Sequence, residues 1–123
     1  MDKNIKEQKI NEEYVNLRKA LKNIPEEKMS VATGLIENAA FMAVTLDELK
    51  ENVNENGAIC TYNRNPVESP AIKSYNTMIN RYGNIMAQIL ALLPKEEQSA
   101  AAQEVNVKAK QLQKFISKKN DSK

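Results

Sequence analysis

The feature that most constrains this chain is a long amphipathic stretch, Gly34 to Asn56. Its apolar residues recur at alternating steps of four and three, as Leu35, Ala39, Met42, Leu46, Leu49 and Val53. This spacing places all six on one side of a single helix, which is typical of a helix that packs against another helix along its length. A helix of about 23 residues is roughly 35 Å long. The sequence therefore requires a second long helix to cover this apolar side.

The expected partner is the segment 70–93, where Ser69 and Pro70 are typical of a helix start and Pro94 marks the end. Two long helices joined by about a dozen residues lie antiparallel as a helical hairpin. The apolar face of this segment is wider than one partner helix buries, so we expect part of it to contact a third element or another chain. The candidate oligomer-interface residues are Tyr75, Met78, Tyr82, Ile85, Met86 and Ile89.

The stretch between these two helices favours a short β-hairpin. Gly57 follows Asn56 as a helix stop, because glycine can adopt the left-handed conformation at the cap. Residues 58–62 favour a strand, residues 63–66 favour a turn, and residues 67–68 can pair back against the first strand. A two-stranded ribbon is marginal alone, so we expect it to lean on the helices or on a neighbouring subunit.

Helices are also expected on both sides of the helical hairpin. Residues 3–24 form a charged helix that ends before Pro25, and residues 95–118 form a second one with a sparse apolar seam. A short helical turn over residues 25–30 can run straight into the long helix. Thr45 begins a capping-box pattern, which would break the long helix at that point. We prefer a continuous helix because the apolar side keeps its phase through Thr45.

The predicted fold class is therefore all-α. It combines a long antiparallel helical hairpin (31–56 and 70–93) with a β-hairpin-like connection (58–68) and flanking N-terminal (3–24) and C-terminal (95–118) helices. The expected organisation is a charged N-terminal helix in 1–28, an oligomerisation core in 29–94, and a basic C-terminal helix and tail in 95–123.

The composition excludes most catalytic chemistry, because the chain has no histidine and a single cysteine, Cys60. A Ser-His-Asp or Cys-His site, a Cys/His zinc site and an intrachain disulfide cannot be built. Carboxylate pairs such as Asp47 and Glu51 fall on an exposed helix face, and there is no glycine-rich phosphate loop. We expect no catalytic, metal or cofactor site, no small-molecule substrate, and Cys60 as a small apolar residue.

Charge is unevenly placed along the chain: residues 31–56 sum to −4 and residues 95–123 to +3. No apolar run approaches the roughly 20 residues of a membrane span, and the N-terminus has no signal-peptide core, so we expect a soluble intracellular protein with no membrane partner. The C-terminal lysines either contact DNA phosphates or form an ordinary charged tail. The candidate DNA-binding residues are Lys108, Lys110, Lys114, Lys118 and Lys119. The next candidates are Lys3, Lys6, Lys9, Arg18, Lys19 and Lys22.

Three features follow one another over about residues 28–98. The stretch VATGLIENAAFMAVTLDELKENVNENG ends in Asn-Gly, AICTYNRNPVE follows, and SPAIKSYNTMINRYGNIMAQILALLPKEEQ closes on Leu-Leu-Pro. This order resembles phage terminase small subunits of the Terminase_4 type, found in prophages of low-GC Gram-positive bacteria. Many small terminases carry an N-terminal helix-turn-helix, whereas residues 1–30 show a single charged helix.

The resemblance implies a small, non-enzymatic DNA-packaging factor. Such a protein forms a homo-oligomeric ring, engages double-stranded viral DNA and presents it to a large terminase subunit that holds the ATPase and nuclease. It would act in the cytoplasm of an infected or lysogenic bacterial host. The alternative is a helical protein-interaction adaptor or regulator without nucleic-acid binding, which fits the near-neutral net charge of +2 better.

Overall fold

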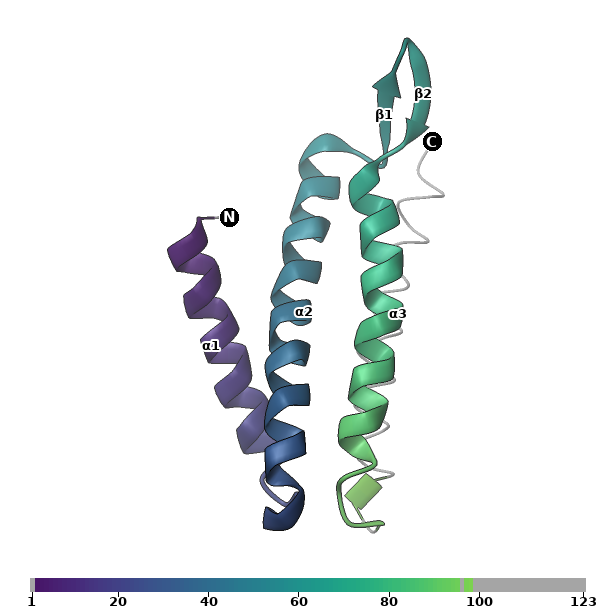
Figure 1. The fold of residues 1–123 in the computed structure, drawn as a ribbon. Coiled ribbons are helices and arrows are strands. Elements are labelled where there is room, and N and C mark those ends of the chain that lie inside the picture. Colours follow the sequence, from purple (N-terminus) through teal and green to yellow (C-terminus); the bar gives the residue numbers. More distant parts are fainter. Residues whose placement is uncertain (1, 96, 99–123) are drawn as a thin grey trace.

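A computed structural model gives the fold of residues 2–95, 97 and 98, which are the residues that the structure describes. The elements in chain order are α1 (Lys3–Ala20), the 3₁₀ turn η1 (Glu26–Lys28), α2 (Met29–Asn56), β1 (Ile59–Tyr62), β2 (Asn65–Glu68) and α3 (Pro70–Leu90). The three helices stand side by side with α2 in the middle, and the β-hairpin projects beyond the ends of α2 and α3 (Figure 1). The mostly helical fold with a short hairpin connection confirms the predicted fold class.

The helices α2 and α3 pack antiparallel and hold the core of the described chain (Figure 1). The largest fully buried side chains all belong to this pair, namely Tyr75, Ile36, Ile72, Ile89 and Val53. Full burial of an apolar side chain of this size contributes about 1.5–3 kcal/mol relative to exposure. The helix α2 is continuous through Thr45, as preferred from its sequence.

The starts and stops of these two helices follow local sequence signals. The turn η1 runs directly into α2, as predicted. At the other end of α2, Gly57 has φ of +83° and its N–H donates to Val53 O at 2.8 Å. Ser69 caps α3, because its Oγ accepts a hydrogen bond from the N–H of Ala71 at 3.2 Å. These local groups fix where the β-hairpin leaves and rejoins the helices.

The helix α1 ends at Ala20 rather than at residue 24 as predicted. The following turn places Leu21 and Ile24 in the core, where they are 5% and 4% exposed. The N–H of Ile24 donates to Leu21 O at 3.2 Å within this turn. The helix therefore ends where the chain turns to bury these two side chains. This point lies before the residue whose helical geometry Pro25 disfavours.

The helix α3 ends at Leu90 rather than at residue 93. The N–H groups of Leu92 and Leu93 donate to carbonyls three residues earlier, at 3.0 and 3.1 Å, so the chain tightens from α to 3₁₀ geometry. Gln98 Nε2 then donates to Leu93 O at 2.8 Å. This side chain satisfies one of the carbonyls that the end of a helix leaves without an intrahelical partner.

The helix α1 is attached to α2 less firmly than α3 is, since none of its own residues is buried. It lies on the side of α2 away from α3 (Figure 1). Lys6 forms an ion pair with Glu48, and its Nζ lies 4.8 Å from the centre of the Phe41 ring. Ala40 and Val44 share this face of α2 and are buried. The middle helix therefore packs on two faces, of which the sequence indicated only the one toward α3.

One segment of the described chain, Glu26–Asn56, is long and apolar enough to cross a membrane by length and composition alone. This corrects the expectation that no apolar run approaches that length. Its buried side chains pack within the helical core, which is how the core helix of a soluble protein passes the same test. The finding is consistent with a soluble protein.

Candidate functional site

The predicted DNA-binding lysines at the C-terminus, Lys108 to Lys119, lie outside the described residues, together with most of the predicted helix 95–118. Their contact with DNA stays a prediction. The second set of basic candidates lies in α1 and the turn that follows it, and the structure brings three of them together.

These three cations surround a groove at the C-terminal end of α1, which we name the basic groove. Its volume is about 710 Å³, and its lining residues are Tyr14, Val15, Arg18, Lys19, Lys22 and Met29. None of the six is acidic, and Lys19 and Lys22 are exposed. The arrangement offers positive charge and an apolar floor to a ligand that carries negative charge along an extended surface.

Arg18 is held in position at the wall of this groove. Its Nη1 donates to Tyr14 Oη at 3.0 Å and to Thr33 Oγ1 at 3.3 Å. The Thr33 hydroxyl in turn donates to Met29 O at 2.8 Å. A guanidinium carries five N–H donors, so Arg18 is fixed by two contacts and keeps donors for a phosphate.

A purely structural role also accounts for part of this cluster. Basic side chains in the last turn of a helix interact favourably with the negative end of its dipole, and Arg18 and Lys19 occupy that turn in α1. Lys22 follows the helix and is exposed. Helix stabilisation does not explain why the side chains of all three residues line the same groove.

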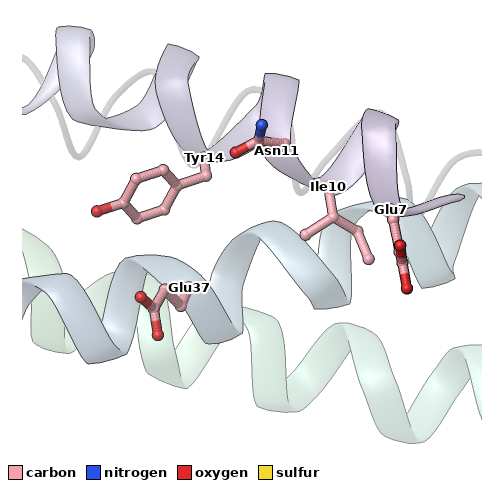
Figure 2. Close-up of a pocket in the computed structure, with 5 residues that line it drawn as sticks. All are labelled: Glu7, Ile10, Asn11, Tyr14 and Glu37. Carbon is pink, nitrogen blue, oxygen red and sulfur yellow. The ribbon is translucent and has the colours of Figure 1, made fainter. Parts of the chain in front are cut away.

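A second groove lies between α1 and α2, with a volume of about 450 Å³, and is lined by Glu7, Ile10, Asn11, Tyr14 and Glu37. Figure 2 shows Ile10 and Tyr14 extending from α1 toward α2, with Glu7 and Glu37 toward opposite ends of the view. Both glutamates are exposed, whereas general acid–base catalysis needs a shielded carboxyl. Among the residues that the structure describes, no three His, Cys, Asp or Glu side chains gather to hold a metal ion.

The structure gives most of the predicted oligomer-interface residues a place inside the chain. Tyr75, Tyr82, Met86 and Ile89 are buried in the core. Met78 and Ile85 are half-buried and pack against the same core, so these two keep surface for a neighbouring chain. Association of chains through this set stays a prediction.

Burial also changes the acid–base properties of Tyr75. Desolvation by burial, with a smaller contribution from the negative charge of Asp47, raises the pKa of Tyr75 to about 12. Its phenol therefore loses its proton at a higher pH in the folded protein than in the unfolded chain.

The β-hairpin is the most exposed element of the described chain. All eight residues of β1 and β2 are exposed, including Ile59 at 62% and Tyr62 at 68%. Asn63 and Arg64 have φ of 50° and 68°, the left-handed values of a type I′ turn. The pairing of residues 67–68 with the first strand is confirmed. Asn65 and Pro66, predicted as turn residues, instead belong to β2 and pair with Tyr62 and Thr61, because the two-residue turn at 63–64 already reverses the chain. The hairpin does not lean on the described helices. Cys60, expected to act as a small apolar residue, is likewise exposed.

Comparison with protein-family models, with curated proteins and with solved structures finds no match for this chain. The resemblance to terminase small subunits therefore rests on the residues and the order of the elements alone.

Proposed function

We propose that this chain is a small terminase subunit, which oligomerises, engages double-stranded viral DNA for genome packaging and presents it to a separate large ATPase and nuclease subunit. The basic groove is the observation that carries this proposal. Clustered cations with no acidic neighbour in the groove neutralise phosphates without reading bases, which suits a protein that engages duplex DNA largely independently of sequence. The proposal places the protein in the cytoplasm of an infected or lysogenic bacterial host.

The order of the elements supports the same proposal. A long helix, a glycine stop at Gly57, a short hairpin and a helix that opens on Ser69 follow one another as the resemblance implies. Met78 and Ile85 of α3 are half-buried apolar residues seven positions apart. This spacing places them on one side of α3 and suits packing against a helix of a neighbouring chain, as a ring requires.

The test is the binding of a labelled DNA duplex of about 30 base pairs, measured by fluorescence anisotropy over a series of salt concentrations. The variant Lys19→Glu/Lys22→Glu reverses two charges of the groove and leaves the contacts of Arg18 in place. We expect its affinity to fall at least about tenfold at low salt, and the slope of log affinity against log salt to fall by about one to two units.

The matched control is Lys73→Glu/Arg81→Glu, which makes the same change in net charge at exposed positions of α3. We expect this control to bind DNA nearly as well as the wild type. Lys73 and Arg81 themselves line a groove on α3, so equal losses in both variants would show that DNA does not prefer the basic groove and would remove it as the DNA site. Wild-type protein that binds no duplex at 50 mM salt would refute a DNA-engaging role.

The β-hairpin favours a second candidate function, that of a protein-interaction adaptor without nucleic-acid binding. Its exposed apolar side chains, among them Ile59, Tyr62 and Val67, suit contact with protein more than with phosphate. Recovery of a cellular protein partner by a wild-type chain that fails to bind DNA would favour this function over the first.

A further inference from the structure

The β-hairpin has one strand edge that is open to pairing and one that is blocked. Its register places Ile59 opposite Glu68, Cys60 opposite Val67, Thr61 opposite Pro66 and Tyr62 opposite Asn65. The strands are exposed along their whole length, so neither edge is covered by another described element. Exposed edges are sites of pairing with another chain unless Pro or charged residues protect them.

The hydrogen-bonding pattern shows which backbone groups of β1 face outward. Just below the hairpin, Ser69 N–H donates to Ala58 O at 2.7 Å, so the residue pair 58 and 69 faces inward. Inward and outward residues alternate along an antiparallel strand. Cys60 and Tyr62 therefore turn their backbone groups toward β2, while Ile59 and Thr61 turn theirs away from it.

The same alternation explains how β2 is protected. Pro66 lies opposite Thr61, at a position whose backbone faces outward. Its missing N–H therefore costs the hairpin no hydrogen bond. The same missing N–H leaves the outer edge of β2 without a donor at this position. Glu68 adds a charge to that edge. Strand β1 carries neither a proline nor a charged residue, and the outward N–H and C=O groups of Ile59 and Thr61 remain available.

We propose that β1 pairs antiparallel with β1 of a second copy of this chain. One register uses every outward group of both strands: Ile59 pairs with the second copy's Thr61, and Thr61 with the second copy's Ile59. Shifting the register would bring Gly57, with its non-strand φ of +83°, or the turn residue Asn63 into the ladder. The two hairpins thereby form a four-stranded antiparallel sheet about a two-fold axis that passes between the two Cys60 residues.

The side chains of β1 fit a copy of the same strand. The strand is uncharged, so self-pairing brings no like charges together. Cys60 and Val67 share one face of the hairpin because they are directly opposed. Pairing would extend this face into an apolar row across all four strands, with Val67 at both ends. A two-stranded hairpin is marginal in water, and a four-stranded sheet removes that weakness.

This contact is isologous, so it closes at two copies and differs from the head-to-tail contact that builds a ring. It stands on the hairpin alone and does not depend on DNA binding. A single short sheet contact is weak, and it becomes strong when several copies on one assembly engage together.

Cys60 gives a direct test, because the proposed register makes it a non-hydrogen-bonded pair with the second copy's Cys60, with Cα atoms about 4.5 Å apart. That separation is within the range of a disulfide. Copper phenanthroline serves as the oxidant on full-length protein at micromolar concentration. We expect a disulfide-linked dimer to form about 100-fold faster than in Cys60→Ser/Thr61→Cys, whose thiols are displaced along the strands and on the other face.

The variant Thr61→Pro blocks the open edge while leaving the hairpin intact, because the N–H of Thr61 faces away from β2. We expect it to abolish rapid crosslinking through Cys60 while the helical circular dichroism stays unchanged. Thr61→Lys, which puts a charge at the edge without restricting the backbone, is expected to act in the same direction. Equal crosslinking rates for the wild type and the displaced thiol, or rapid crosslinking in both edge variants, would overturn the proposal. Slow crosslinking of the wild type, together with weaker DNA binding by the variant Arg64→Ala, would overturn the proposal in favour of a nucleic-acid contact at the hairpin.

Discussion

Replacing Gly57 by alanine tests the junction between α2 and the β-hairpin. Gly57 has φ of +83° and ψ of 169°, a combination that is essentially restricted to glycine. An added Cβ would meet nothing nearer than Ile59 O at 4.0 Å, so the substitution causes no clash with its surroundings. The cost is therefore backbone strain alone. We expect Gly57→Ala to lower the free energy of unfolding by about 1–3 kcal/mol.

The chain offers two matched controls for this substitution, Gly34 in α2 and Gly83 in α3. Both residues are helical and exposed, and an added Cβ has no neighbour within 4 Å at either position. Alanine is favoured over glycine in a helix interior by about 1 kcal/mol. The same chemical change is thus expected to stabilise the protein at these two positions and to destabilise it at Gly57.

Urea and thermal unfolding, followed by the helical circular dichroism signal at several protein concentrations, measure all three variants. A change of 1 kcal/mol corresponds to a shift in Tm of about 4–8 °C for a domain near this size. Unchanged or higher stability in Gly57→Ala would refute the positive φ at the end of α2. A loss of stability in Gly83→Ala that deepens with protein concentration would show that the exposed side of α3 is covered by another chain.

Three further predictions concern single side chains and α1. Because the pKa of Tyr75 is raised in the folded protein, the unfolded chain loses this proton first as the pH rises above 10. We therefore expect the free energy of unfolding to fall from pH 10 toward 12, by about 1 kcal/mol at pH 11. Urea unfolding of Tyr75→Phe should lack this part of the fall. Thr45 Oγ1 is buried with no hydrogen-bond partner among the described residues, so Thr45→Val should raise the free energy of unfolding by about 1 kcal/mol in the same assay. The amides of Lys3–Ala20 should exchange with deuterium well before those in the middle of α2 and α3, because α1 contributes no buried residue of its own; equal protection in all three helices would contradict this.

The parts of the fold that follow from sequence are those with signals spanning a few residues. The apolar spacing of α2 predicted a continuous helix with an antiparallel partner, and Ser69 and Gly57 marked where the helices begin and end. The alternation of β1 and the turn residues predicted the hairpin pairing. The caps act within one helical turn of the residue that carries them, and the apolar spacing of α2 repeats the same short step at each turn from Leu35 to Val53.

The parts that sequence did not predict depend on residues that meet only in space. Ala40 and Val44 gave no apolar seam of their own, although they form the buried second face of α2. The turn after α1 brings Leu21 and Ile24 into the core cluster that also holds Tyr75, which is why less of the apolar face of α3 is left over than its sequence suggested. The spacing of Tyr14 and Arg18 was readable as a helical pair, but the contact of Arg18 with Thr33 required the turn.

The basic groove and the β-hairpin lie at opposite ends of α2, and this separation allows their roles to be tested independently. The groove includes Met29, the first residue of the helix, whereas the hairpin follows its last residue, Asn56. A helix of this length spans about 40 Å, several times the Debye length of about 8 Å at physiological salt. Charge reversal at Lys19 and Lys22 therefore has no electrostatic route to the pairing of β1. Because of this distance, we expect Lys19→Glu/Lys22→Glu to weaken DNA binding without changing the pairing of β1. We expect Thr61→Pro to prevent the pairing of β1 without changing DNA binding.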